Sequence, residues 1–173
     1  MSTQTPFTHP ILSVETFPVQ GPDRVHRYVR IRTSDWVNCV PITEDNHVVL
    51  VRQFRHGIEQ STLEVPGGAV DPGEDPEVAG VRELREETGY AGSRVIPMGW
   101  VWANPAIQTN RTFLFLIQGA RQVGEPEPDP TEDIEVVRAP VGDIAKLLAD
   151  GQINHSLAVV ALQRAILRGA LPG

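Results

Sequence analysis

The sequence contains one cysteine and one lysine among its 173 residues, and it has no apolar run long enough to cross a bilayer. The lone thiol of Cys39 excludes an internal disulfide and a thiolate metal site, which favours a reducing compartment. A membrane-spanning helix needs about 20 apolar residues, and residues 1–10 lack both the basic and the apolar part of a signal peptide. We therefore expect a cytoplasmic protein with no membrane partner.

Basic side chains are outnumbered, since 15 lysine and arginine residues stand against 22 aspartate and glutamate residues and leave a net charge of −7. A surface of this sign repels the phosphates of DNA and RNA, so nucleic acid is not an expected partner. The apolar share of 40% and the charged share of 21% are those of a globular protein, and the length fits a single domain.

Segments typical of strands come first in the chain, and segments typical of helices end it. Four prolines among polar residues predict an irregular or edge-like segment over residues 1–24, followed by one folded domain over 25–173. β-Branched and aromatic residues predict strands, and apolar residues at helical spacing predict helices. The strands are expected at 25–32, 36–42, 48–54, 95–102, 112–118 and 134–139, and the helices at 76–88, 141–149 and 156–167. This pattern indicates a mixed α/β domain.

The helix expected over 76–88 has marked ends. Asp75 is a suitable N-cap, Pro76 fits the first helical position, and Gly89 is placed as the C-terminal stop. For the last helix, Asn154 or Ser156 is available as the N-cap.

Three carboxylates, Glu83, Glu86 and Glu87, project from one face of the first helix within a single turn. Like charges at this spacing repel by about 0.2–0.5 kcal/mol per pair, so a cation is expected between them. Mg²⁺ and Mn²⁺ prefer several oxygen ligands and need neither cysteine nor histidine. The alternative is an acidic face that is only solvated, with Arg82 and Glu86 as an ordinary i,i+4 ion pair.

The spacing of the surrounding residues favours the metal site. The fixed positions of a 23-residue pattern are all matched, by Gly68, Glu74, Arg82, Glu83, Leu84, Glu86, Glu87, Gly89 and Tyr90. The sequence resembles the Nudix hydrolase family across this whole box. The resemblance implies an α/β/α sandwich with a mixed β-sheet, N-terminal antiparallel strands and C-terminal helices.

The physical logic of the box can be followed without the resemblance. The turn of Gly67 and Gly68 lets the backbone approach the ions closely, because no Cβ stands in the way. Glu74 can reach the helix from the loop and orient Arg82, which in turn fixes the carboxylates.

The resemblance implies which groups hold Mg²⁺ or Mn²⁺. Glu83 and Glu87 carry over as ligands, and Glu86 assists. The carbonyl of Gly67 takes the position of the family's backbone ligand. Arg82 and Glu86 are then part of the catalytic set.

Residues outside the box resemble the branch of ADP-ribose pyrophosphatases and nucleoside-diphosphate-sugar hydrolases. The similar segments are 48–55, 63–68, 131–136 and 151–162, together with Pro105. This branch splits ADP-ribose or a related sugar nucleotide into a nucleoside monophosphate and a sugar phosphate. Arg52 and Arg55 are suited to clamp the diphosphate, the alternative being surface charge on an edge strand, and Glu64 is expected to contact metal or ribose.

A further carboxylate is needed to accept a proton from the attacking water. In the resembling branch this base lies on a loop, here residues 124–133. Glu132 is the expected base, with Glu127 and Asp133 as alternatives. On composition alone, the loop can also be an acidic solvated linker.

Several residues depart from the pattern or receive no role. Asn110 stands five residues after Pro105, where members specific for ADP-ribose carry an acid, so other sugar nucleotides stay open as substrates. Trp36, Trp100 and Trp102 could stack on a base, although packing in the core is as well supported. Without ligand spacing, no role is assigned to His26, His47, His56 and His155.

The branch also implies a homodimer in which substrate contacts can cross the interface, and symmetric dimers are common in any case. Two other functions remain open. One is a Nudix-like ligand sensor that has lost catalysis, although the acids of the box are intact. The other is a nucleoside triphosphate pyrophosphatase, which the segments outside the box disfavour.

Overall fold

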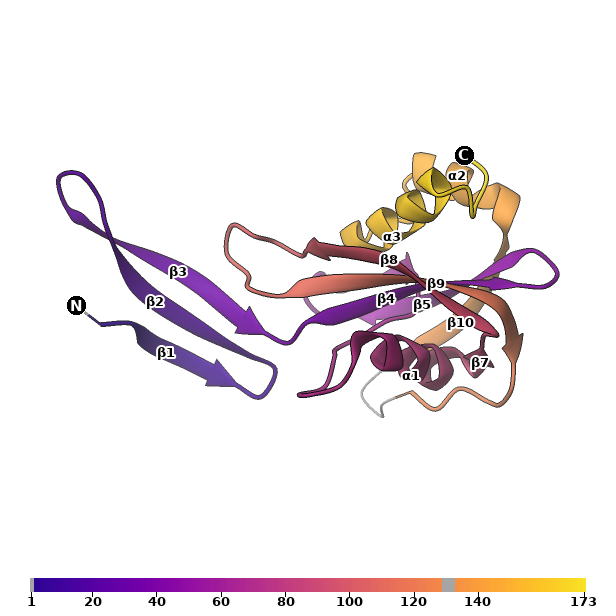
Figure 1. Ribbon diagram of the computed structural model, residues 1–173, viewed down its shortest axis with the longest axis horizontal. Coiled ribbons are helices and arrows are strands. Elements are labelled where there is room, and N and C mark those ends of the chain that lie inside the picture. Colours follow the sequence, from indigo (N-terminus) through magenta and orange to yellow (C-terminus); the bar gives the residue numbers. More distant parts are fainter. Residues whose placement is uncertain (1, 129–132) are drawn as a thin grey trace.

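The computed structural model describes residues 2–128 and 133–173 and contains two sheets, of which one is covered by helices (Figure 1). Strands β1 (Gln4–His9), β2 (Leu12–Gln20) and β3 (Val25–Thr33) form an antiparallel sheet, called here the N-terminal sheet. It extends to one side of the body, and no helix covers it (Figure 1).

The body is built on a mixed seven-stranded sheet. Its strands are β4 (Trp36–Thr43), β5 (His47–Arg55), β6 (Gln60–Glu64), β7 (Tyr90–Ala91), β8 (Arg94–Trp102), β9 (Arg111–Gln122) and β10 (Ile134–Pro140). The order is β10-β5-β4-β9-β7, with β6 against β5 and β8 against β9. The β4–β9 pair is parallel, and the other pairs are antiparallel.

Helices cover both faces of this sheet (Figure 1). They are α1 (Pro76–Thr88) on one face and α2 (Ile144–Ala149) and α3 (Ser156–Leu167) on the other. Alternation along β4 sends Val37 and Cys39 into the apolar cluster under α1 and Val40 into the cluster under α3. Complete burial of such a side chain stabilises the fold by about 1.5–3 kcal/mol. The predicted α/β/α sandwich is confirmed.

Helix α1 begins and ends where the sequence predicts. The Asp75 side chain accepts a hydrogen bond from the Glu77 amide at 2.8 Å. Gly89 has a φ of 72°, a conformation that favours glycine, and its amide donates to the Arg85 carbonyl. Both ends fix the register of the acids along the helix.

Helix α1 packs closely on β4 at one point. The buried thiol of Cys39 donates to the Gly80 carbonyl at 3.2 Å, and a Cβ on Gly80 would lie 2.9 Å from the Cys39 sulfur. Burial raises the pKa of the Cys39 thiol, so this group is neutral and serves in packing.

Residues 1–24 were predicted to be irregular or edge-like, and most of them form strands: β1 lies at the edge of the N-terminal sheet, as expected, but β2 lies at its centre. Two of the prolines lie where the pairing of β1 with β2 is interrupted or has ended. Pro6 lies on the edge strand β1, where the register shifts. Pro18 lies on β2 beyond the last residue that pairs with β1. Edges of this kind are where strands accept proline.

Two local features also differ from expectation. Strand β6 was not predicted, because Gln60, Ser61 and Thr62 are polar and only its pairing with β5 holds it in the sheet. The N-cap of α3 is His155, and its side chain makes no capping hydrogen bond. The expected caps, Asn154 and Ser156, flank it.

Candidate active site

Arg82 is the centre of the charged contacts on α1. Its guanidinium donates to both oxygens of Glu74 at 3.0 Å, and it donates to Glu83 and to Glu86 at 2.9 Å. A further bond reaches the Ala69 carbonyl at 3.1 Å. The predicted orientation of Arg82 by Glu74 is therefore observed, and so is the i,i+4 pair with Glu86.

These contacts favour the charged forms of both partners. The hydrogen bonds that Arg82 donates to Glu74, followed by its interactions with Glu83 and Glu86, raise the pKa of Arg82. Arg82 and the amide of Asp71 lower the pKa of Glu74 below its usual range. Arg82 therefore stays charged while it bonds to two acids of the helix, Glu83 and Glu86.

The loop between β6 and α1 runs beside β4. The amides of Cys39 and Val37 donate to the carbonyls of Pro66 and Gly68 at 2.8 and 2.9 Å. Among the described residues, no hydrogen bond reaches the carbonyl of Gly67. This carbonyl is the predicted backbone ligand, and its position between two paired carbonyls suits that role.

The two glycines of the loop make close contacts, Gly67 with backbone and Gly68 with the end of a side chain. A Cβ on Gly67 would lie 2.1 Å from the Val37 carbonyl, and one on Gly68 would lie 2.5 Å from a carboxylate oxygen of Glu83. The amide of Gly67 donates to Glu87 at 2.9 Å. The loop and the helix acids are thus in direct contact, as the box requires.

The groups around the loop are chemically suited to a hard dication. They are the carboxylates of Glu83, Glu86 and Glu87 with the Gly67 carbonyl, all of them oxygen donors. Within residues 2–128 and 133–173, no three acidic, histidine or cysteine side chains are gathered tightly enough to form a ready-made ion cage. Two of these acids, Glu83 and Glu86, accept hydrogen bonds from Arg82.

A cavity of about 360 Å³ opens beside this loop, and Gly67 and Gly68 form part of its wall. The polar side chains that line it are those of Trp36, Asn38, Arg55, Glu64 and His155.

Arg55 and Glu64 are paired inside this cavity. Two bonds of 2.7 Å join the guanidinium to the two oxygens of Glu64, and the Thr62 hydroxyl donates to one of them. Burial opposes ionisation of Glu64, but these hydrogen bonds outweigh it and lower its pKa. Both residues were expected at the site, and the structure brings them together.

His155 was missed from the sequence. Its Nδ1 lies 3.1 Å from an oxygen of Glu64, although the approach is too bent to form a hydrogen bond. The sequence carried no signal for this contact, because its helix pattern pointed to Asn154 or Ser156 as the cap, and the structure places His155 there.

The loop after β9 is attached to the C-terminal half of α1. The amide of Glu127 donates to the Glu86 carbonyl at 2.7 Å, and the amide of Gly124 donates to the Gly89 carbonyl at 3.2 Å. A cavity of about 580 Å³ lies between this loop and α1. Glu132, the expected base, lies outside the described residues, and Asp133 is exposed.

Other predicted substrate contacts lie elsewhere. Arg52 lines neither cavity and faces Glu135 on β10, with 3.2 Å between Nε and the carboxylate. Pro105 is exposed in the loop that ties the body to β3, where the Ile31 amide donates to the Ile107 carbonyl. Neither residue joins Arg55 at the loop.

Asn110 is buried, although the sequence placed it at a specificity position. It is 1% exposed, and among the described residues neither atom of its amide has a hydrogen-bond partner. The Thr112 hydroxyl, two residues along β9, is buried in the same way. Such groups usually bond to ordered water.

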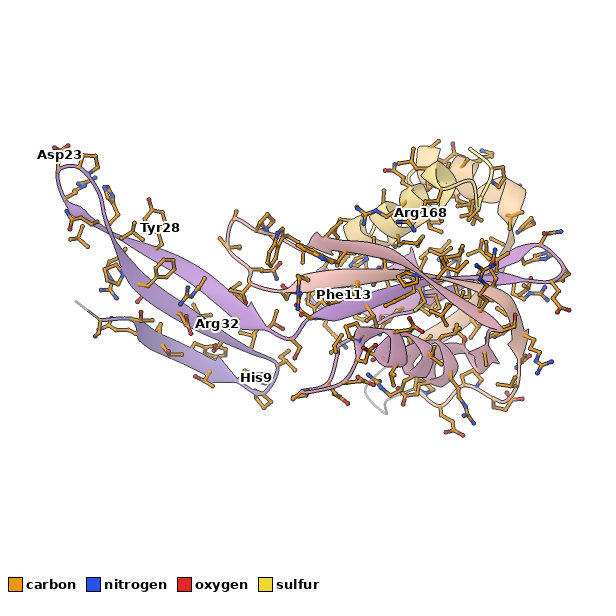
Figure 2. All side chains as sticks on the ribbon, viewed as in Figure 1. His9, Asp23, Tyr28, Arg32, Phe113 and Arg168 are labelled. Atoms are coloured by element: carbon orange, nitrogen blue, oxygen red, sulfur yellow. The ribbon has the colours of Figure 1, made fainter. Side chains whose placement is uncertain are left out.

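The core packing considered for two tryptophans is not found. Trp100 and Trp102 are 44% and 49% exposed on β8, and their rings meet edge to face with centroids 5.1 Å apart. Arg111 lies over the rings of Trp100 and Phe113 and is held by Asp35. Figure 2 shows Phe113 on the body, near the end that faces the N-terminal sheet.

Known proteins resemble this chain over most of its length. A NUDIX domain is matched over residues 33–159. The chain is 29% identical over 136 residues to the ADP-ribose pyrophosphatase of Bacillus subtilis (strain 168), covering 78% of this chain and 74% of that protein. It is 30% identical over 170 residues to the ADP compounds hydrolase NudE of Escherichia coli (strain K12), covering 88% of each chain.

The resemblance extends to three dimensions. A crystal structure of an ADP compounds hydrolase matches with a TM-score of 0.85 and 26% identity, covering 98% of this chain and 94% of that one. Coverage this complete includes the N-terminal sheet as well as the body. No helix in the described part of the chain has the length and apolar character to span a bilayer.

Proposed function

Because the chain belongs to the Nudix hydrolase family and is a Nudix pyrophosphatase, we propose that it cleaves the diphosphate of ADP-ribose or a related nucleoside diphosphate sugar with Mg²⁺ or Mn²⁺. The products are a nucleoside monophosphate and a sugar phosphate. The observation that carries the proposal is the contact of the loop with two acids of α1, Glu87 at the Gly67 amide and Glu83 beside Gly68, at the edge of a polar cavity.

The metal is held by Glu83, Glu87 and the Gly67 carbonyl, with help from Glu86. A bound dication lowers the pKa of water and polarises a phosphoryl oxygen. Arg82 stays charged, bonds to Glu83 and Glu86, and reaches the loop through the Ala69 carbonyl. The cavity beside the loop receives the group attached to the diphosphate.

The proton of the attacking water is accepted by a carboxylate of the loop after β9, with Glu132 as the proposed base. The support is the anchoring of this loop to α1 next to Glu86, through the amide of Glu127. We expect Glu132→Gln to lower kcat by about 10²- to 10⁴-fold, with metal binding kept. An unchanged rate would assign the base to Glu127 or Asp133.

We further propose that the enzyme is a cytoplasmic homodimer joined through the N-terminal sheet. The buried thiol of Cys39 suits a reducing compartment. Apolar side chains of the N-terminal sheet are left half exposed, among them Phe7, Tyr28 and Val29. A second copy would cover them.

The test is a panel of nucleotides with Mg²⁺ and with Mn²⁺, scored for release of nucleoside monophosphate. The panel contains ADP-ribose, ADP-glucose, GDP-mannose, dinucleoside polyphosphates and nucleoside triphosphates. Cleavage of sugar nucleotides that stops when EDTA removes the ion is expected. Preference for triphosphates would assign the enzyme to nucleotide pyrophosphatases, and binding without cleavage would make the protein a ligand sensor.

A further inference from the structure

The segment 66–70, called here the Gly67 loop, is joined to β4 and its approach by backbone hydrogen bonds. Two of them run from amides of β4 to carbonyls of the loop, at 2.8 and 2.9 Å. The third runs the other way, from the Val70 amide to the carbonyl of Asp35 at 2.8 Å. Asp35 lies one residue before β4 begins at Trp36, so this bond holds the end of the loop to a residue outside the strand.

Asp35 is itself held from the other side by Arg111, at the start of β9. Its Oδ1 accepts from the Arg111 amide at 2.7 Å, and its Oδ2 accepts from Nε and Nη2 at 3.1 and 2.6 Å. Charge-assisted bonds made by two nitrogens at once are strong and directional. The guanidinium also lies over the ring of Phe113, 4.8 Å from its centroid. Both the carboxylate and the carbonyl of Asp35 are therefore fixed.

The opposite side of the Gly67 loop contacts α1. The Gly67 amide donates to Glu87 at 2.9 Å, and Arg82 donates to the Ala69 carbonyl at 3.1 Å. The loop is thus bonded to β4 on one side and to the charged groups of α1 on the other. A shift at its Val70 end would displace the groups that the proposed function assigns to the metal.

We propose that the Asp35–Arg111 pair is a positioning clamp for the Gly67 loop. By fixing the Asp35 carbonyl, the pair holds the Gly67 carbonyl and the contact of the loop with Glu87 in the arrangement that binds the dication. Neither Asp35 nor Arg111 lines either cavity of the site, so the pair acts through the loop and not on the substrate. The identity of the ion rests on the proposed function, whereas the hold on the loop does not.

The hold on the loop is measured by amide hydrogen exchange in EDTA, without metal or nucleotide. We expect Asp35→Ala to raise the exchange rate of the Val70 amide by about two- to tenfold, because the bond to the Asp35 carbonyl opens more often. Arg111→Ala should act in the same direction and less strongly, because the amide of residue 111 still donates to Asp35. The amide of Leu50, a buried residue paired with β10, reports global unfolding in each variant.

The effect on the site is measured by Mn²⁺ titration followed by electron paramagnetic resonance, with no nucleotide present. Loss of a group that supports metal ligands weakens metal binding by about 10- to 100-fold. We expect Asp35→Ala to weaken Mn²⁺ binding by about tenfold, the lower end of this range, because it acts through the loop. A pair with only a structural role would lower the melting temperature and leave the Mn²⁺ affinity unchanged.

Arg138 provides a matched control. Its side chain is 41% exposed against 42% for Arg111, and its Nη2 lies 2.5 Å from Asp45 against 2.6 Å from Arg111 to Asp35. Asp45 follows β4, whereas Asp35 precedes it, so this second pair lies at the other end of the strand. Arg138→Ala should keep both the exchange of the Val70 amide and the Mn²⁺ affinity of the wild type.

Three results would overturn the inference. They are unchanged exchange of the Val70 amide in Asp35→Ala and Arg111→Ala, equal acceleration at Val70 and Leu50, and wild-type Mn²⁺ affinity in Asp35→Ala. A wild type that binds Mn²⁺ and cleaves no nucleotide would instead overturn the proposed function and leave the clamp standing.

Discussion

The Nudix box and the N-terminal sheet are both held by arginine–glutamate contacts, but the two regions differ in how these contacts are packed. In the box, Arg82 bonds to acids from the loop and from α1, and the acid Glu87 is 2% exposed. In the N-terminal sheet, Glu15 likewise accepts from Arg30 and Arg32, at 2.6 and 2.5 Å. The contacts are alike, but only those of the box lie against an apolar core.

The difference lies in what surrounds the ionic contacts. The box rests on buried side chains such as Leu84 and Val37. The N-terminal sheet carries Tyr28 and Val29 at 52% exposure, and Figure 2 shows Tyr28 on a sheet with no helix beside it. A small sheet without a covered apolar face is weakly stable alone. The box is therefore defined by its own contacts, whereas the N-terminal sheet needs a second surface.

The largest expected effect is on the acids of the box. Glu83→Gln and Glu87→Gln remove negative charge from the proposed metal site while keeping the shape of the side chains. We expect kcat for the best sugar nucleotide to fall by about 10³-fold or more, because the ion supplies much of the catalysis. Thermal unfolding without metal should change little, since repulsion between like charges is relieved. Full activity in either variant would contradict its assignment as a ligand.

The two glycines of the loop should respond differently to alanine. In Gly67→Ala the new Cβ meets the Val37 carbonyl, a backbone atom that cannot move aside, so we expect a loss of about 1–3 kcal/mol in the free energy of unfolding. In Gly68→Ala it meets the end of the Glu83 side chain, which can rotate away. That variant should fold nearly as wild type and lose kcat. Urea unfolding with steady-state kinetics separates the two, and equal destabilisation would contradict the difference.

The need of the N-terminal sheet for a second surface can be tested by Val29→Glu. Val29 lies in the middle of β3, and a charge there would be buried if a second copy covers the sheet. We expect the mass measured by light scattering to fall from that of a dimer to that of a monomer. The control is Leu167→Glu, on an apolar side chain that is 86% exposed at the end of α3. A wild type that is already monomeric would contradict the proposed dimer.

The sequence predicted the box more completely than the cavity beside it. The ends of α1 and the contact between Glu74 and Arg82 follow from residues close together in the chain, where caps and helical spacing decide the outcome. His155 and Glu64 lie far apart in the chain, one just before α3 and the other at the end of β6. No local pattern could give that contact, which depends on how α3 packs against the sheet.

The N-terminal sheet shows a similar limit of prediction from the sequence. Its prolines suggested irregular structure, because the sequence does not show which strand positions lie at an edge. Trp100 and Trp102 alternate as strand residues do, yet β8 is an outer strand and both rings stay exposed. Alternation predicted the strand correctly and did not reveal whether another layer covers it.

The smallest expected effects come from the paired acids Glu64 and Glu15. Arg55 and Thr62 lower the pKa of Glu64 against the opposing effect of burial, while Arg30 and then Arg32 lower that of Glu15. A carboxyl whose pKa is lower in the folded than in the unfolded state stabilises the fold at pH above its ordinary pKa, which is 4.5 for both residues. This stabilisation is lost as pH falls through the lower pKa of the folded state.

Glu64→Gln should therefore lower the free energy of unfolding by about 1–3 kcal/mol at pH 7, and its difference from wild type should shrink below pH 4.5. Glu15→Gln should show the same sign and a smaller change, because water and salt screen the N-terminal sheet. Melting temperatures from pH 7 to 3 measure both, and an equal loss at Glu15 would mean that its sheet is as well covered in solution as the body.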